Sequence, residues 1–177
     1  VLSNPAAVTA DILAFSPVSC FGGANGSATV TAGGGTPTYS YIWKNAANTT
    51  VSAAATASGL VAGTYRVTVF DNSGCTATAS VNITQPTQVV ANILNTSNVN
   101  CLGGANGTAT AGASGGTAPY TFTWPVAVTG ALRTGLTAGT YTVTATDANN
   151  CTATATAIIT EPATLPTISA SSVVNVL

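Results

Sequence analysis

One pattern of cysteine, glycine and aromatic residues occurs twice in the chain, and this repeat constrains the fold more than any other feature. The segment Cys20–Gly26 (CFGGANG) recurs as Cys101–Gly107 (CLGGANG). The segment Leu60–Tyr65 (LVAGTY) recurs as Leu136–Tyr141 (LTAGTY), and a further cysteine follows each of them at the same distance. The chain is therefore predicted to contain two copies of one structural unit.

A third repeated motif sets the expected boundaries of the two repeats. Ile83–Pro86 (ITQP) resembles Ile159–Pro162 (ITEP), and Leu2–Pro5 (LSNP) fits the same position. Each repeat then begins with a proline, which stiffens the junction. The expected organisation is the tail of a preceding repeat at 1–4, a first repeat at 5–85, a second at 86–161 and the first strand of a following repeat at 162–177.

Short segments rich in threonine, valine and alanine alternate with turns that contain glycine and asparagine, which predicts an all-β chain. Trp43 and Trp124 lie on the expected third strand of each repeat, where one large ring fills the space between two sheets. Tyr65 and Tyr141 end motifs that are typical of a tyrosine corner, in which the hydroxyl bonds to upstream backbone. The prediction is two tandem immunoglobulin-like β-sandwich modules in an elongated array, with these four aromatic residues in the structural core.

The expected strands follow from alternation and turn signals. They lie near residues 8–14, 27–32, 39–43, 49–53, 64–70 and 76–84 in the first repeat and near 89–94, 108–113, 120–124, 140–146 and 152–160 in the second.

These motifs resemble the SprB-type repeat of gliding-motility adhesins and related giant bacterial surface proteins. The resemblance lies in Cys-x-Gly-Gly-x-x-Gly, in the Gly-Gly-Thr turn before tyrosine and tryptophan, in Leu-x-x-Gly-Thr-Tyr, and in Asp-x-x-x-Cys before a threonine-rich strand. It implies export to the surface of a gliding bacterium by type IX secretion and a role as adhesin or surface filament. The sequence departs from the pattern at Leu177, where the spacing from Pro162 would place the next cysteine.

The scarcity of charge excludes several classes of function. Charged residues make up 4% of the chain, the net charge is −1 and histidine is absent. The cations Lys44, Arg66 and Arg133 are too few to bind nucleic acid or an anionic membrane surface, and no apolar stretch is long enough for membrane insertion. Because the few carboxylates form no pair and no base is available to activate a nucleophile, neither an enzyme nor a cofactor is expected.

Asp71 and Asp147 each end a strand shortly before a cysteine. As a Ca²⁺ site each turn would offer one carboxylate, whereas a tight site takes roughly six to eight oxygen ligands. An Asx turn that closes a hairpin is the favoured interpretation, and no metal site is predicted.

The cysteines Cys20, Cys75, Cys101 and Cys151 are expected to form disulfides, since two cysteines per repeat in a secreted chain without histidine favour disulfides over zinc. The favoured pairing lies within each repeat, Cys20–Cys75 and Cys101–Cys151. Immunoglobulin topology supports an alternative, because it places the first loop and the last hairpin turn at opposite poles. A bridge requires Cα atoms within about 7 Å, so in that case Cys20 would approach Cys151 of the next repeat.

A surface with so little charge is prone to non-specific association, and two features could prevent it. One is assembly, in which copies of the chain cover each other's lateral surfaces in a fibre. The other is a glycan cover, although a chain rich in threonine and asparagine also produces sequons by chance. The possible glycosylation sites are Asn25, Asn48, Asn82, Asn95, Asn106 and Asn150, each of which begins an Asn-x-Ser/Thr sequon.

The leading functional hypothesis is a structural stalk or extracellular fibre segment of a cell-surface adhesin. Its rival is a carbohydrate- or surface-binding adhesion module, which would cluster exposed aromatic and polar side chains on one face. The candidates for such a face, Phe21 and Tyr41 with Leu102 and Phe122, are few. The expected partners are therefore neighbouring repeats and other copies of the chain, with surface glycans in the rival case, at an extracellular, cell-surface location.

Overall fold

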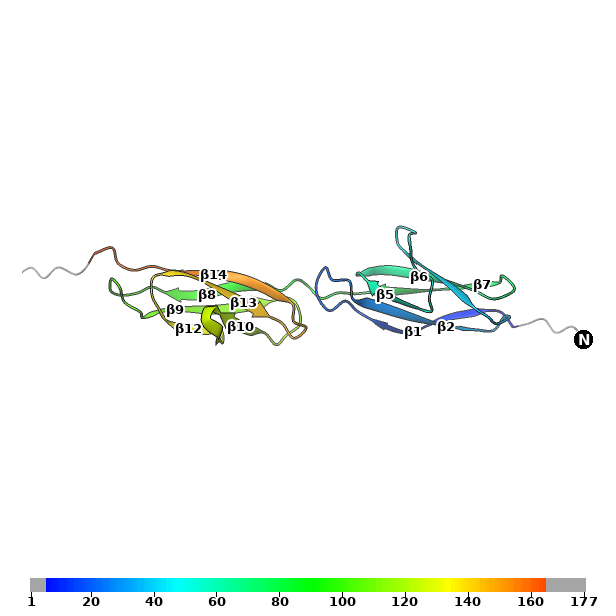
Figure 1. Cartoon of the computed structure of the whole chain (residues 1–177), viewed down its shortest axis with the longest axis horizontal. Helices are drawn as coiled ribbons and strands as arrows, with labels where there is room; N and C mark the ends of the chain where they lie inside the picture. Colours follow the sequence, from blue (N-terminus) through cyan, green and yellow to red (C-terminus); the bar gives the residue numbers. More distant parts are fainter. Residues whose placement is uncertain (1–5, 165–177) are drawn as a thin grey trace, which may run out of the picture. The chain divides into compact units, whose positions relative to one another are not determined.

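The computed structural model of the chain describes residues 6–164 and consists of strands, turns and one short 3-10 segment. The chain divides into two compact units, each with its own β-sandwich (Figure 1). Of the described residues, the first unit comprises 6–88, 115–118 and 148–151, and the second comprises 89–114, 119–147 and 152–164. The expected tail at 1–4, and all of the expected strand at 162–177 except its first three residues, lie outside the described residues.

The first sandwich packs a three-stranded sheet, in the order β1-β2-β5, against a four-stranded sheet, in the order β4-β3-β6-β7. All neighbouring strands are antiparallel. The chain crosses between the sheets after β2, β4 and β5, as in an immunoglobulin-like sandwich. The strands are β1 (Thr9–Ser16), β2 (Gly26–Gly33), β3 (Ser40–Asn45), β4 (Thr50–Ser52), β5 (Thr56–Leu60), β6 (Gly63–Phe70) and β7 (Thr76–Ile83).

The second sandwich repeats this topology, with sheets in the orders β12-β9-β8 and β11-β10-β13-β14. It differs between β10 and β12, where a 3-10 segment and a two-residue strand replace the longer β3–β4 hairpin of the first sandwich. The elements are β8 (Val90–Ser97), β9 (Gly107–Ser114), β10 (Thr121–Trp124), η1 (Pro125–Ala127), β11 (Val128–Thr129), β12 (Leu132–Leu136), β13 (Gly139–Thr146) and β14 (Thr152–Ile159).

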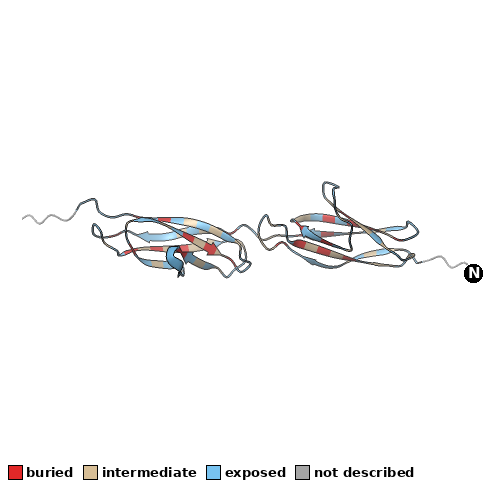
Figure 2. Cartoon of the chain, viewed as in Figure 1, coloured by how far each residue is buried: buried red, intermediate tan, exposed pale blue. Residues whose placement is uncertain are grey.

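Alternating side chains build the core of each sandwich, as the burial pattern along the strands shows (Figure 2). In β6 the side chains of Tyr65, Val67 and Val69 are buried, whereas Arg66 between them is exposed. Trp43 is completely buried on β3, and its indole N–H donates to the carbonyl of Ala54 at 3.0 Å. A buried indole that keeps its hydrogen bond adds a large apolar surface without leaving a polar group unpaired.

The second core is organised in the same way around Trp124. This side chain is buried on β10, and its indole N–H donates to the carbonyl of Gly130 at 2.9 Å. The two sandwiches therefore share the tryptophan at the centre of an immunoglobulin-like core.

A tyrosine fixes the passage from β5 to β6 in the first sandwich and from β12 to β13 in the second. The Tyr65 hydroxyl donates to the carbonyl of Val61 at 3.0 Å, and the Tyr141 hydroxyl donates to the carbonyl of Thr137 at 3.1 Å. Tyr65 is buried and Tyr141 is half-buried. Both bonds reach back to the backbone just upstream, which is the geometry of a tyrosine corner.

The structure contains three strands that the sequence does not predict: β5, β12 and the two-residue β11. The segments of β5 and β12 are short and consist mainly of small or polar residues, and each contains a glycine with positive φ, Gly59 or Gly135. Such segments lack the alternation of large apolar and polar side chains that identifies a strand. Pairing with β2 or β9 makes them strands nonetheless.

We expect Tyr65→Phe to destabilise the first sandwich by about 1 kcal/mol, the net contribution of one hydrogen bond. Tyr141→Phe should cost less, because Tyr141 is only half-buried and water can replace the lost bond there more easily than at the buried Tyr65. Denaturant unfolding of both variants would measure this order. A Tyr65→Phe variant as stable as the parent chain would contradict the tyrosine corner.

Candidate functional site

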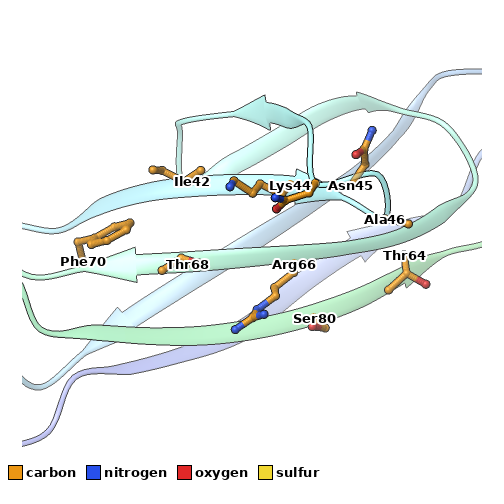
Figure 3. Close-up of a pocket in the computed structure, with 10 residues that line it drawn as sticks. Ile42, Lys44, Asn45, Ala46, Thr64, Arg66, Thr68, Phe70 and Ser80 are labelled. Atoms are coloured by element: carbon orange, nitrogen blue, oxygen red, sulfur yellow. The ribbon is translucent and has the colours of Figure 1, made fainter.

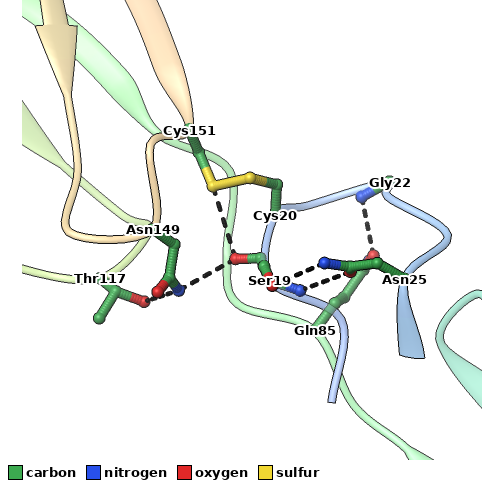
Figure 4. The surroundings of a disulfide bond; sticks show 8 residues. All are labelled: Ser19, Cys20, Gly22, Asn25, Gln85, Thr117, Asn149 and Cys151. Atoms are coloured by element: carbon green, nitrogen blue, oxygen red, sulfur yellow. Dashed lines mark hydrogen bonds between the residues drawn. A yellow bond between two sulfur atoms is a disulfide. The ribbon is translucent and has the colours of Figure 1, made fainter. Parts of the chain in front are cut away.

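Side-chain hydrogen bonds hold the β1–β2 loop, which carries Cys20, in one conformation (Figure 4). The Ser19 amide donates to Asn25 Oδ1 at 2.9 Å, and Asn25 Nδ2 donates to Ser19 Oγ at 2.7 Å. The Gly22 amide donates to Gln85 Oε1 at 2.8 Å. These bonds fix Cys20 between two anchored residues.

The loop is seated on the core at both of its ends. The Val18 side chain is buried, and its amide donates to the carbonyl of Thr84, just after β7, at 2.8 Å. Gly26 begins β2 where an added Cβ would lie 2.7 Å from Ile83 Cγ2 and 2.9 Å from the Leu60 carbonyl oxygen. Because no side chain fits there, glycine at this position lets the loop approach the core closely.

Asp71 organises the hairpin turn between β6 and β7, which carries Cys75. Its Oδ1 accepts from the amides of Ser73 at 2.9 Å and Cys75 at 2.8 Å, and its Oδ2 accepts from the amide of Thr36 at 2.8 Å. The carboxylate therefore closes an Asx turn and ties the turn to the β2–β3 loop, as the favoured interpretation predicts. Within residues 6–164, three or more potential metal-ligating side chains do not gather at any point.

The hydrogen bond from the Thr36 amide is the main cause that lowers the pKa of Asp71 below its ordinary value of 3.8. Burial acts in the opposite direction, and the amides of Cys75 and Ser73 add to the lowering. Amide donors favour the charged carboxylate, so their combined effect exceeds the cost of desolvation.

A disulfide joins Cys20 of the first repeat to Cys151 of the second, within the first of the two compact units. Their Cα atoms are 5.7 Å apart, which is an ordinary separation for a disulfide. Beside the bond, Asn149 Nδ2 donates to the Ser19 carbonyl and to Thr117 Oγ1, both at 3.1 Å (Figure 4). Polar contacts thus accompany the covalent link on the side of the β13–β14 turn.

The predicted pairing within each repeat is therefore wrong, and the alternative bond between Cys20 and Cys151 is present. The reason is the length of β7: the Cys20 loop lies beside Thr84 at one end of this strand, whereas Cys75 precedes Thr76 at the other end. An eight-residue strand spans about 25 Å, far more than a disulfide can bridge. Cys75 and Cys101 are free and exposed in this chain, so the expectation that all four cysteines are bonded does not hold within it.

The six sequon asparagines are all exposed. They lie in the cysteine loops (Asn25, Asn106), in turns (Asn48, Asn150) and on the edge strands β7 and β8 (Asn82, Asn95). Asn106 Oδ1 accepts from the Asn100 amide at 3.2 Å, as Asn25 does from Ser19. Two of the six thus have a structural role in a loop, and glycosylation at all six stays a prediction.

The aromatic candidates for sugar binding lie on different parts of the first sandwich. Phe21 is exposed in the cysteine loop, whereas Tyr41 packs against the core from β3. In the second sandwich Leu102 is exposed in the equivalent loop and Phe122 packs against the core. Phe21 and Leu102 therefore occupy equivalent positions in the two cysteine loops, whereas Tyr41 and Phe122 lie on strands β3 and β10.

The outer face of the sheet β4-β3-β6-β7 instead carries a hollow of about 520 Å³ (Figure 3). Lys44 on β3 and Arg66 on β6 are directly opposite each other across the two strands. Ile42 and Phe70 line the same hollow. Two like charges at directly opposite positions repel each other, so the sheet gains no stability from this pair.

The family model of the SprB repeat matches the chain twice, at residues 13–48 and 93–129. Each match runs from within the first strand of a sandwich, through its cysteine loop and second strand, to beyond the end of its third strand. The chain is thus similar to the SprB repeat at two places. This confirms the resemblance that the motifs indicate, and SprB repeats occur in cell-surface proteins.

No curated protein is significantly similar to the chain in sequence. Among solved structures, the three N-terminal domains of the highly immunogenic outer capsid protein (Hoc) of bacteriophage RB49 match with a TM-score of 0.54 at 18% identity, over 86% of this chain and 59% of theirs. The C-terminal 282-residue fragment of intimin, solved with the intimin-binding domain of the translocated intimin receptor, matches with a TM-score of 0.43 at 18% identity, over 90% of this chain and 64% of the fragment. The chain thus spans less than two thirds of either relative, and the Hoc match shows a shared fold.

Across residues 6–164, the structure contains no helix with the length and apolar character that crossing a bilayer requires.

Two residues hold the cysteine loops in a role that was not predicted from the sequence. Gln85, and Glu161 at the equivalent position, accept hydrogen bonds from the glycine amides of the cysteine loops, Gly22 at 2.8 Å and Gly103 at 2.6 Å. The signal was present, because an acceptor of similar size precedes proline at both junctions. Asn25 begins a sequon, but the same asparagine recurs in both Ala-Asn-Gly segments, which also fits a residue that closes the loop.

Asp71→Asn should lower the denaturation temperature at neutral pH, because an amide must turn its NH₂ group toward one of the backbone amides that Asp71 now accepts. The pKa of Asp71 is lowered in the folded state, so its contribution is full at neutral pH and is lost as the pH falls below about 3.8. The gap between the variant and the parent chain should therefore shrink below pH 4. Asp11→Asn, at an exposed position on β1, is the matched control, and an equal effect of both substitutions would refute this role.

Proposed function

We propose that this chain is a force-carrying spacer of a bacterial cell-surface adhesin, with a structural and non-catalytic role. The observation that supports this most is the path of the covalent chain through the Cys20–Cys151 disulfide. The two cysteines are 131 positions apart, so the bond closes a covalent loop that contains most of the residues of both sandwiches.

Tension applied to the chain on either side of this loop follows the shortest covalent path. It passes from the segment before Cys20 through the disulfide to the segment after Cys151, and residues 21–150 lie outside that path. The strands β2 to β13 lie wholly within the bypassed segment. If a sandwich unfolds under tension, the unfolded residues within this segment therefore do not lengthen the chain between its two ends. A stalk of constant length requires this property.

The SprB repeats support the surface location of this role. The finer features proposed with it are export by type IX secretion, a gliding bacterium as the source, glycosylation at the exposed sequons, and copies of the chain as partners in a fibre. They rest on the resemblance to SprB-type repeats and on the low charge of the chain.

Single-molecule stretching between the two chain ends tests the mechanical claim. Without reductant the bypassed segment should contribute nothing to the final length, and reduction should add about 450 Å, since an extended residue spans about 3.5 Å. The double variant Cys20→Ser/Cys151→Ser should reach the longer length in both conditions. Equal lengths with and without reductant in the parent chain would contradict the proposal.

Immunogold electron microscopy of intact cells of the source organism tests the location. Antibodies to this chain should label filaments outside the cell, whereas antibodies to a cytoplasmic protein should label only permeabilised cells. Label that appears only after permeabilisation would contradict a surface role.

The hollow on the first sandwich favours a second candidate function, the binding of an acidic polysaccharide. Lys44 and Arg66, two of the chain's three cations, lie opposite each other beside Ile42 and Phe70. A carboxylate or sulfate group between the two cations would relieve their repulsion, and the apolar side chains could pack against a sugar ring. In the second sandwich Pro125 and Thr142 take the corresponding positions, so this role would belong to the first repeat alone.

Binding to immobilised polyuronate, with neutral dextran as the comparison, tests this candidate. Lys44→Ala and Arg66→Ala should each weaken binding at least about tenfold, because a hydrogen bond to a charged group contributes about 1.5–3 kcal/mol. Arg133→Ala is the charge-matched control in the second sandwich, since its side chain instead donates to the Pro125 carbonyl. Equal binding to dextran, or equal loss in all three variants, would rule out the site.

A further inference from the structure

The cysteines of the two repeats fall into two kinds, defined by their place in the fold. Loop cysteines lie between the first two strands of a sandwich (Cys20, Cys101), and hairpin cysteines lie in the turn before its last strand (Cys75, Cys151). The disulfide in the structure joins one loop cysteine to one hairpin cysteine of the other repeat. The two that remain free, Cys75 and Cys101, are again one of each kind.

The free loop around Cys101 has the same internal bonds as the loop around Cys20. The Gly104 amide donates to the Cys101 carbonyl at 2.9 Å, and the Gly23 amide donates to the Cys20 carbonyl at 3.0 Å. The amide before each cysteine donates to the loop asparagine, and the glycine two positions after it donates to Gln85 or Glu161. The Cys101 loop therefore holds the bonding conformation while its thiol is free.

The free hairpin turn around Cys75 likewise matches the bonded turn around Cys151. The residue after the turn aspartate donates its amide to a threonine carbonyl in both, Asn72 to Thr36 at 2.9 Å and Ala148 to Thr117 at 2.8 Å. The next side chain contacts the hydroxyl of the same threonine, from Ser73 Oγ at 3.0 Å and from Asn149 Nδ2 at 3.1 Å. The β6–β7 turn thus holds Cys75 with hydrogen bonds that correspond to those with which the β13–β14 turn holds Cys151.

We propose that Cys101 and Cys75 form this same loop-to-hairpin disulfide between copies of the chain, Cys101 of one chain with Cys75 of the next. The bonded pair Cys20–Cys151 shows that the two kinds of cysteine are complementary, and both free thiols are exposed. Each chain offers one partner of each kind, so the bonds link chains in one direction into an unbranched polymer. This inference is independent of the proposed mechanical role.

The bond needs a disulfide oxidant, and oxidised glutathione or a thiol oxidoreductase of the same chemical class supplies it. One protein thiolate attacks the oxidant disulfide, which forms a mixed disulfide and releases the first oxidant thiolate. The second protein thiolate attacks the protein sulfur of this mixed disulfide and displaces the other oxidant thiolate. The two protein thiols lose two electrons and two protons in total, and one oxidant disulfide is reduced to two thiols. The Cys20–Cys151 bond is unchanged by these steps.

The test uses the full chain and the variants Cys75→Ser and Cys101→Ser, incubated with oxidised glutathione and examined by non-reducing gel electrophoresis. The parent chain should form a ladder of polymers that reductant dissolves. Each variant alone should stay largely monomeric, and an equimolar mixture of the two should form dimers at least several-fold faster than either. Circular dichroism, and the persistence of the Cys20–Cys151 link, would show that the variants remain folded.

Chymotrypsin can cut after Leu94 and so separate Cys75 from Cys101, which identifies the linked peptides. The proposal predicts that bonds between Cys75 and Cys101 dominate. Random collision would give bonds of Cys75 with Cys75, of Cys75 with Cys101 and of Cys101 with Cys101 in a ratio of 1:2:1. That ratio, dimers of a single variant as fast as those of the mixture, or monomers throughout would each overturn the proposal.

Discussion

The antiparallel path of the strands within each sandwich is the constraint on which the cysteine chemistry depends. Because β7 runs the length of its sheet, it separates the Cys20 loop, held at Thr84, from the turn that carries Cys75. Two cysteines at opposite ends of one sandwich cannot meet, however regular their spacing in the sequence. Each is instead available to a cysteine of the other kind from a different repeat, and Cys20–Cys151 is such a bond.

The loops that present these cysteines are shaped by hydrogen bonds from backbone amides to side-chain amide and carboxylate oxygens. Asn25 and Gln85 close the loop, and the single carboxylate of Asp71 organises the turn with three backbone amides. Such bonds need few charges, which explains how a chain with 4% charged residues still holds defined loops. The loop bonds recur in the second sandwich with Asn106 and Glu161 as acceptors, so the loop around Cys101 has its conformation without a disulfide.

The core was more predictable from the sequence than the loops were. Trp43 and Tyr65 occur in motifs whose spacing expresses local geometry, and the structure places them where an immunoglobulin-like sandwich requires them. The strand β5 was missed because its small residues carry no periodic signal, and only its pairing with β2 defines it. The disulfide was misassigned because equal spacing within a repeat favours an internal pair, whereas the actual pairing depends on which end of a strand each cysteine occupies.

Peptide mapping of the oxidised monomer by mass spectrometry tests the central claim most directly. Trypsin cuts this chain after Lys44, Arg66 and Arg133, so Cys20 and Cys151 fall in the peptides 1–44 and 134–177, and Cys75 and Cys101 fall together in 67–133. The account predicts that 1–44 is linked to 134–177 and that 67–133 is released as a free peptide with two thiols. Bonds within each repeat would instead give a single product in which 67–133 is linked to both 1–44 and 134–177, and that product would contradict the account.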